Sequence, residues 1–333
     1  MDTADVGDRE QPRHLPVLVE EAIGFLDPAR GGCYVDCTVG LGGHTAALLE
    51  RFPAVRAIGL DRDDQALGLA AERLAVFGDR VTLANGCFDE LGRRLKELGI
   101  GRVQGVLADL GVSSLQLGDS ERGFAFGLDG PLDMRMGAGE LSAAEIVNRY
   151  SEEELTKILR EYGEERWARR IAREIIGERQ TKPFETTAEL RRLVERVKPL
   201  PPLRYKARRV RRPGGRTPGG RRRIHPATQT FQALRIEVNR ELEQVRELLE
   251  QSVNMLERDG RLVVISYHSL EDRIVKHRLR ELAAGEIEPI TGRPRTETQV
   301  IEVMTKRPVR PGADELAANP RSRSARLRAA RRL

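Results

Sequence analysis

The chain has 333 residues and a formal net charge of +6, from 57 Lys or Arg and 51 Asp or Glu. This length is enough to bury a sizeable core and is typical of about two domains. We find no signal peptide and no apolar run of membrane-spanning length, which disfavours the secreted and membrane classes of protein.

The three cysteines, Cys33, Cys37 and Cys87, form no CxxC pair and no even-numbered disulfide framework. We therefore expect reduced thiols in a cytoplasmic protein. A metal site made of Cys33, Cys37 and His44 is disfavoured because their spacing matches no common zinc pattern. We predict no metal.

Positive charge is concentrated in two segments. Residues 196–236 contain thirteen Lys or Arg and no acidic residue, and residues 319–333 contain six Arg and no acidic residue. The rest of the chain is therefore acidic overall. Clustered Arg binds polyanions because it releases counterions from phosphates, so we favour a nucleic-acid partner over a solvated loop that only keeps the protein soluble.

The first 13 residues are polar and are expected to form a flexible tail. Four apolar runs then read as buried strands, with helix-like stretches between them: CYVDCTV, VRAIGLD, VTLANG and VQGVLADLG. Alternating strands and helices predict an α/β fold, with a parallel sheet covered by helices on both faces.

The turn after the first strand contains Gly40, Gly42 and Gly43 and opens a helix, the place where nucleotides bind in open α/β sheets. No Lys-Ser or Lys-Thr follows, which disfavours a triphosphate loop, and the G-x-G-x-x-G pattern of dinucleotide binding is incomplete. Asp61, which ends the second strand, suits the ribose hydroxyls of NAD or S-adenosylmethionine equally. Asp36 could reach a methionine ammonium, so S-adenosylmethionine is modestly favoured. A tight turn without ligand stays an alternative.

The alternating pattern breaks after Gly111, and charged helices follow from Ser142 to about Val197. We predict an inserted, mostly helical domain at 118–223, ending in a basic linker at 204–223, within a main domain of 14–117 and 224–333. Trp167 is expected in the core of the insert rather than as a base-stacking platform. A long amphipathic helix from about Thr228 to Glu257 and a fifth strand, RLVVISYHS, complete the pattern.

Several stretches, in order along the chain, resemble consecutive motifs of one family. They include HLPVLVEEAIGFL, VDCTVGLGGHT, GLDRD, VLADLGVSSLQL, DGPLDMRM, YGEERWARRIA, HPATQTFQALRIEVNREL, VISYHSLEDRIVK and NPRSRSARLR. The family is the MraW/RsmH ribosomal RNA methyltransferases, and the resemblance runs from about His14 to Arg328. It implies a Rossmann-like class I methyltransferase domain with S-adenosylmethionine as cofactor.

The resemblance further implies methylation of the exocyclic N4 amine of a decoding-centre cytidine in the bacterial small-subunit (16S) ribosomal RNA. The implied partner is this RNA or the assembling small ribosomal subunit, with a homodimer left open. The cofactor-binding residues implied by the resemblance are Gly42, Gly43, His44, Asp61, Phe88, Asp109 and Gln116. For Phe88 the residues alone would favour a core aromatic.

Three positions depart from the family pattern as we know it: Cys37, Leu41 and Leu115. They lie between the implied ligand residues rather than on them, so they affect the shape of the loops more than the chemistry. The segment 204–223 is longer than the family leads us to expect.

Methyl transfer to an aromatic amine needs alignment and a hydrogen-bond acceptor on the amine. We expect Asp109 or a neighbouring carbonyl to be that acceptor, with Ser113 and Ser114 lining the pocket. His268 is a second catalytic candidate, although it could equally order the turn around Glu271. The target base is expected to flip out of its stack, with Arg135 and the basic segments holding phosphates.

Two other functions account for part of the sequence. An NAD-dependent oxidoreductase would use the glycine turn but would need no basic segments. A non-catalytic RNA-binding or assembly protein would need the basic segments but not the ordered cofactor motifs.

Overall fold

A computed structural model describes residues 16–137, 139–198, 225–285 and 298–333. The chain forms two compact units: one contains the residues up to Ser114 and from Leu242 onward, and the other contains Leu115–Glu241. The expected tail at 1–13 and the basic linker at 204–223 lie outside the described residues. No helix in the described ranges is long and apolar enough to cross a lipid bilayer.

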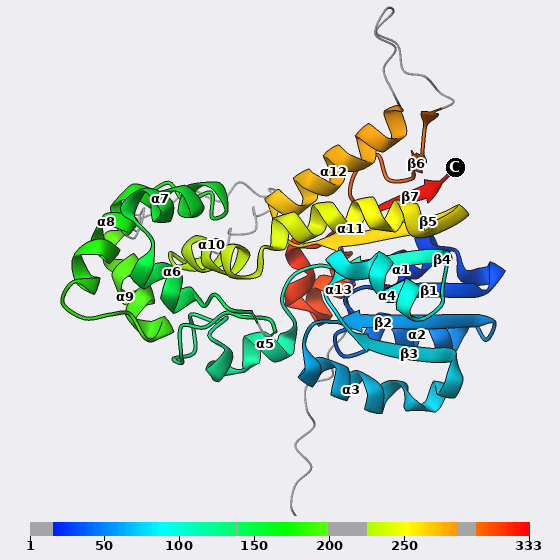
Figure 1. Ribbon diagram of the computed structural model, residues 1–333, viewed down its shortest axis with the longest axis horizontal. Coiled ribbons are helices and arrows are strands. Elements are labelled where there is room, and N and C mark those ends of the chain that lie inside the picture. The colour runs from blue at the N-terminus through cyan, green and yellow to red at the C-terminus, as the bar shows by residue number, and fades with distance from the viewer. Residues whose placement is uncertain (1–15, 138, 199–224, 286–297) are drawn as a thin grey trace, which may run out of the picture. The chain divides into compact units, whose positions relative to one another are not determined.

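The first unit contains a seven-stranded sheet in the order β3-β2-β1-β4-β5-β7-β6 (Figure 1). Five strands pair in parallel: β1 (Gly32–Asp36), β2 (Val55–Asp61), β3 (Val81–Asn85), β4 (Val103–Asp109) and β5 (Leu256–Ser266). The predicted parallel sheet is thus confirmed. It is extended by two antiparallel strands that we did not predict, β7 (Arg326–Arg332) and β6 (Ile301–Val303).

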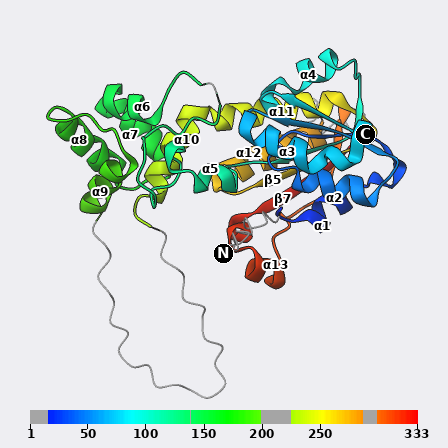
Figure 2. The same ribbon diagram turned by 90° about the horizontal axis from the view of Figure 1, so that it is seen from below.

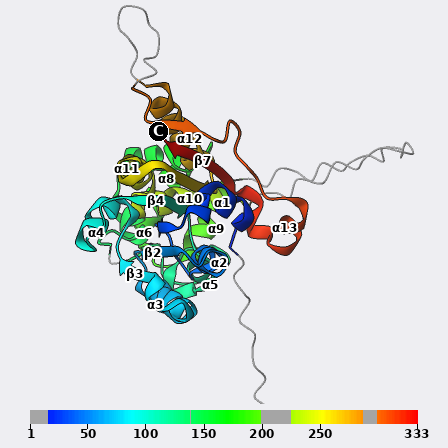
Figure 3. The ribbon, with the colours of Figure 1, turned by 90° about the vertical axis from the view of Figure 1, so that its right-hand side faces the viewer.

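Helices cover both faces of this sheet. One face carries α4 (Leu91–Glu97), α11 (Glu241–Met255) and α12 (Ser269–Ala284), and the other carries α1 (Val19–Leu26), α2 (Gly43–Arg51) and α3 (Asp64–Leu74). Figure 3 shows α11 and α1 on opposite sides of the strands. The strand period of two accounts for this arrangement. In β4, Val106 and Ala108 join the core under α11, whereas Leu107 joins the core under α1.

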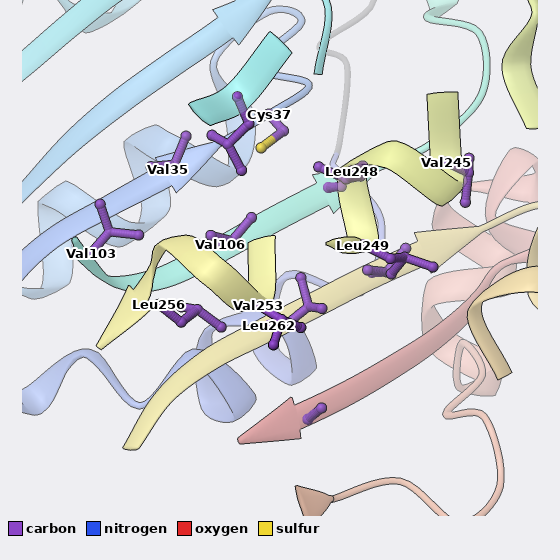
Figure 4. Packing of buried hydrophobic residues seen from close by; sticks show 14 of the residues in the cluster. Val35, Cys37, Val103, Val106, Val245, Leu248, Leu249, Val253, Leu256 and Leu262 are labelled. Atoms are coloured by element: carbon purple, nitrogen blue, oxygen red, sulfur yellow. The ribbon is translucent and has the colours of Figure 1, made fainter. Parts of the chain in front are cut away.

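The core under α11 is the larger of the two. Figure 4 shows Leu248, Leu249 and Val253 of α11 packed toward Val106 of β4 and Leu262 of β5. All five side chains are at most 2% exposed. Burial of this many branched apolar side chains fixes the sheet and therefore the positions of its strand ends, where the candidate site lies.

The second unit is helical. It contains α6 (Ala143–Arg149), α7 (Glu152–Glu161), α8 (Ala168–Arg179), α9 (Thr187–Val197) and α10 (Thr228–Asn239), and Figure 2 shows α6 to α9 grouped together. Three of these helices start with a capping box, in which a Ser or Thr and a Glu satisfy each other's backbone N–H groups. The pairs are Ser142 with Glu145, Ser151 with Glu154, and Thr186 with Glu189. A short helix, α5 (Ser114–Gly118), follows β4 and spans the boundary between the units.

Trp167 is not part of the core of this unit, contrary to our prediction. Its side chain is 39% exposed at the start of α8, whereas Ile171 and Ile175 of the same helix are buried. Trp167 precedes the first helical residue, so it lies outside the helical period that carries the buried stripe.

The long helix expected from Thr228 to Glu257 is two helices. Arg240 breaks it with a left-handed backbone (φ 51°) between α10 and α11. The buried side chain of Asn239 explains the break, because it accepts a hydrogen bond from the Met136 N–H and donates one to the Met134 carbonyl. The second unit therefore extends to Glu241 and includes α10, whereas we expected the insert to end at residue 223.

Two arginines of the C-terminal segment, Arg328 and Arg331, are paired with carboxylates of the fold, which weakens the expectation that this segment binds phosphate. They lie on or next to β7, in the sheet between β5 and β6. Arg328 is buried and its Nε lies 2.6 Å from Asp272 Oδ1. Arg331 pairs with Asp259 and Glu302 at 2.8 Å each. A short helix, α13 (Ala313–Ala318), precedes this segment.

Candidate active site

Three acidic residues end neighbouring parallel strands of the first unit. Asp36 is the last residue of β1, Asp61 of β2 and Asp109 of β4. Because β1 pairs in parallel with both β2 and β4, these strand ends meet at one edge of the sheet. This edge is where open α/β sheets bind their ligands.

The glycine turn lies at this edge, between β1 and α2. Gly42 has φ +74°, a backbone conformation that disfavours side chains, and it precedes the first residue of α2. No side chain caps the N-terminus of α2, so no capping side chain accepts a hydrogen bond from the first N–H groups of this helix. Such N–H groups, with the helix dipole behind them, suit a carboxylate or phosphate.

Asp61 holds the turn in place. Its Oδ2 accepts a hydrogen bond from the Gly40 N–H at 2.9 Å, and its Oδ1 accepts one from the Asp63 N–H at 3.0 Å. Burial raises the pKa of Asp61, although these backbone hydrogen bonds lower it. A half-buried carboxylate with spare acceptor capacity can also receive hydroxyl groups of a ligand.

Asp36 and His44 are buried beneath the turn. Asp36 accepts hydrogen bonds from the Thr38 N–H and from the Thr45 hydroxyl, so both of its oxygens are engaged within the protein. His44 Nε2 lies 2.8 Å from the Val17 carbonyl oxygen, which can only accept. His44 Nε2 therefore donates its hydrogen to this carbonyl oxygen. Its Nδ1 then faces Asp109 Oδ2 at 3.9 Å.

Asp109 is held by two hydrogen bonds. Its backbone N–H donates to the Thr38 hydroxyl at 2.6 Å, and its Oδ1 accepts from the Tyr267 hydroxyl at 2.9 Å. The side chain is 17% exposed. Burial raises the pKa of Asp109 to about 6, and the neighbouring His44 and Tyr267 lower it by less. This carboxyl can therefore accept a proton near neutral pH.

Tyr267 is a site residue that we did not predict. It directly follows β5, which pairs with β4 so that Ile265 lies beside Asp109. The aromatic ring packs against Gly111, whose φ of +105° favours glycine and where a Cβ would come within 3.3 Å of the ring. The sequence did contain a signal for Tyr267. It is a polar residue at the end of the fifth strand, and the ends of paired parallel strands are neighbours.

His268 caps α12, which is the structural alternative that we left open. Its Nδ1 accepts a hydrogen bond from the Glu271 N–H at 3.4 Å, and the Glu271 carboxylate accepts one from the His268 N–H at 3.3 Å. This capping box fixes the chain that carries Tyr267, because Glu271 also accepts from the Tyr267 N–H. A catalytic role for His268 stays a prediction.

The remaining predicted site residues have different surroundings. Phe88 follows β3 and is partly buried, in contact with the core under α11. Gln116 is buried in α5 and belongs to the second unit. Arg135 forms a bidentate pair with Asp133, with Nη2 and Oδ2 2.6 Å apart, and donates to the Gly139 carbonyl. Arg135 is thus already paired within the chain, which weakens our hypothesis that it holds a phosphate.

Comparison with known proteins adds the identity of the family. The model of the MraW methylase family matches residues 11–333. A protein of Pelobacter propionicus named ribosomal RNA small subunit methyltransferase H is 48% identical, over 96% of this chain and 99% of its own length. One of Persephonella marina with the same name is 45% identical, over 96% and 99%.

Solved structures are more distant. An rRNA methylase from Streptococcus thermophilus is 12% identical with a TM-score of 0.41, over 98% of this chain and 99% of that one. A putative methyltransferase from Streptococcus mutans in complex with SAH is 11% identical with a TM-score of 0.42, over 96% and 100%. Similarities at this level add nothing to the fold described above.

Proposed function

The chain belongs to the MraW methylase family, and we propose that it methylates the exocyclic N4 amine of a decoding-centre cytidine in small-subunit ribosomal RNA, with S-adenosylmethionine as methyl donor. The observation that carries this proposal is the partly buried Asp109 at the end of β4, a proton acceptor beside the glycine turn. The cytidine and its N4 amine rest on the family resemblance. The relatives' names support methylation of the small-subunit RNA.

The residues at the turn fit S-adenosylmethionine. The N–H groups of Gly43 and His44, at the start of α2, would bind its carboxylate, and Asp61 would accept its ribose hydroxyls. Phe88, which follows β3, the strand paired with β2, would lie against the adenine ring. The bound cofactor supplies a methyl group activated by a positively charged sulfur.

Asp109 would act on the substrate amine. The reaction replaces one N–H bond of the amine by an N–CH₃ bond and releases one proton. The amine nitrogen is a weak nucleophile because its lone pair is delocalised into the ring. A carboxylate that accepts its N–H both orients the lone pair and takes the proton, a contribution of about 10²–10⁴ in rate. Tyr267 would hold Oδ1 and leave Oδ2 to the substrate.

The base must leave its stack to reach the partly buried carboxylate of Asp109. Enzymes that modify a base commonly extrude the nucleotide into a pocket, at a cost of a few kcal/mol. We therefore infer a flipped-out cytidine as the reacting form.

The test is methylation of small ribosomal subunits purified from cells that lack this enzyme. The protein and labelled S-adenosylmethionine are added, and the modified nucleotide is mapped by mass spectrometry. We expect label on the N4 of one decoding-centre cytidine. The control is Asp109→Asn, which keeps the shape and the Tyr267 hydrogen bond but accepts a proton poorly, and it should lose about a hundredfold in rate.

Label on another atom or nucleotide would contradict the proposed substrate but keep the methyltransferase. Tight binding of subunits without any methyl transfer would contradict the proposed reaction. An Asp109→Asn variant with undiminished turnover would remove Asp109 from the mechanism.

A further inference from the structure

Trp167 is a large aromatic residue that is exposed to solvent, which indicates that it binds a partner. It is the only tryptophan of the chain, and it is 39% exposed at the start of α8. Its neighbour Ala168 and the following apolar positions of the helix are buried, so the helix does not need Trp167 for its core. Large aromatic side chains on an otherwise polar surface commonly mark a binding site.

The backbone that carries the ring is firmly held. The Glu165 carboxylate is 1% exposed, and its Oε1 accepts a hydrogen bond from the Trp167 N–H at 3.0 Å. Its Oε2 lies 2.6 Å from Lys198 Nζ, which also donates to the Pro226 carbonyl at 2.8 Å. A buried ion pair of this kind fixes the backbone that carries the ring, which lowers the entropy lost when a ligand stacks on it.

Arginines lie close to Trp167 along the chain. Residues 166–173 contain four arginines and no acidic residue. The Arg170 guanidinium lies over the Trp167 ring, 5.6 Å from its centroid. Arg166 and Arg170 are exposed and form no ion pair within the described part of the chain. Glu152 is the acidic group that faces the other two, at 3.7 Å from Arg169 and 3.8 Å from Arg173.

An exposed ring next to exposed arginines is complementary to a single-stranded nucleic acid. The bases of such a strand supply flat faces that stack on the indole, and its phosphates supply the negative charge that arginines bind bidentately. A double helix hides its base faces and would use only the arginines. A protein partner would use the aromatic ring but would not need the exposed arginines next to it.

We propose that Trp167, with Arg166 and Arg170, binds an unpaired stretch of RNA by stacking one base on the indole. This surface, the Trp167 surface, lies wholly within the helical unit. The proposal rests on the proposed function and deepens it, because it assigns an RNA contact that is distinct from the reacting nucleotide. The Trp167 surface positions RNA, and Asp109 acts on the target base.

Because the chain has a single tryptophan, its fluorescence reports on Trp167 alone. The full-length protein is titrated with a 12-nucleotide RNA without secondary structure while its tryptophan fluorescence is recorded, and the affinity is measured independently by anisotropy of labelled RNA. We expect quenching that saturates with binding. Trp167→Ala should lower the affinity about tenfold, and Trp167→Phe, which keeps a stacking ring, should restore most of it.

Salt dependence separates the arginines from the ring. Each arginine that contacts a phosphate should, when changed to Ala, reduce the slope of log affinity against log salt by about 0.7, whereas Trp167→Ala should leave this slope unchanged. Arg258→Ala is the matched control, because it removes an exposed arginine from the other unit. It should change neither the quenching nor the part of the affinity that depends on Trp167.

RNA that binds without quenching, or binds Trp167→Ala as tightly as the unchanged protein, would overturn the proposal and leave the surface to a protein partner. Circular dichroism of the variants shows whether they fold, and an exposed ring should be dispensable for folding. Methyl transfer to small subunits is scored separately. Its absence alongside intact quenching would overturn the proposed function while keeping the RNA surface.

Discussion

The ionised form of Asp109 lowers the stability of the folded chain. Burial raises its pKa to about 6, so its ionised form is less favourable in the folded chain than in the unfolded chain. The folded form therefore binds the proton more tightly, and this carboxyl disfavours folding increasingly as the pH rises from about 4 through 6. Side chains that reduce stability in this way are often kept for chemistry.

The pH dependence of catalysis follows from the same group. Methyl transfer should rise with pH as Asp109 ionises, with a half-maximal rate near its pKa of about 6. The Tyr267 hydroxyl stabilises the ionised form by its hydrogen bond. Tyr267→Phe should therefore raise the pKa of Asp109 and move the acid limb to higher pH, so that kcat falls more at pH 6 than at pH 8. Single-turnover methyl transfer across this range measures the shift.

The binding of S-adenosylmethionine should change little in this variant, which separates positioning of Asp109 from loss of the fold. An acid limb that stays in place in Tyr267→Phe would mean that another group sets the pH dependence. A general loss of rate at every pH would assign Tyr267 to packing against Gly111 instead.

At the scale of single elements, β7 shows how a basic sequence can serve the fold. Arg328 projects from β7 to Asp272 of α12, and the two side chains are 8% and 18% exposed. Arg328→Met keeps an unbranched apolar side chain but leaves the Asp272 carboxylate without its partner. We expect a loss of about 3 kcal/mol in the free energy of unfolding, measured by urea denaturation.

Arg323 offers the matched control, since it is exposed in the same segment. Arg323→Met should change the stability by less than about 0.5 kcal/mol. If Arg328→Met kept its stability but weakened the salt dependence of RNA binding, Arg328 would be a phosphate contact after all. The segment would then have the role that its composition first suggested.

These elements also show what the sequence can and cannot predict. The parallel strands and the glycine turn were predictable because buried strands have continuous apolar runs, and Asp61 and Asp109 directly follow them. β7 was missed because arginines alternate with Leu327 and Ala329, so charge masks a strand whose apolar side is buried. The pairing of Arg328 depends on a residue far away in the sequence, which composition does not reveal.

Helix boundaries were the weaker part of the prediction. The apolar period continues from α10 into α11, so nothing in the periodicity marks the break at Arg240. It follows from the tertiary contacts of Asn239 with Met134 and Met136. Tyr267 was missed for a related reason, since its role depends on the pairing of β5 with β4. The N4 amine of the substrate remains a prediction from the family resemblance.

At the scale of the whole molecule, the chain has two units with separate sets of buried residues. The first is discontinuous in sequence, with Leu115–Glu241 inserted after α5 begins. Units with their own cores can open independently, so a ligand that binds one of them stabilises that one first. The turn between β1 and α2, where S-adenosylmethionine is proposed to bind, lies within the first unit.

Hydrogen exchange should reveal this division. At a hundredfold excess over its dissociation constant, S-adenosylmethionine should stabilise the first unit by about 2.7 kcal/mol, with added protection of the amides of Gly43, His44 and the β1 strand. Amides in α7 and α8 should be unchanged, and NAD at the same concentration should protect neither unit. Equal added protection in α7 and α8 would show that the two units open together. That result would make cofactor binding a means of ordering the helical unit, and RNA binding at the Trp167 surface would then depend on S-adenosylmethionine.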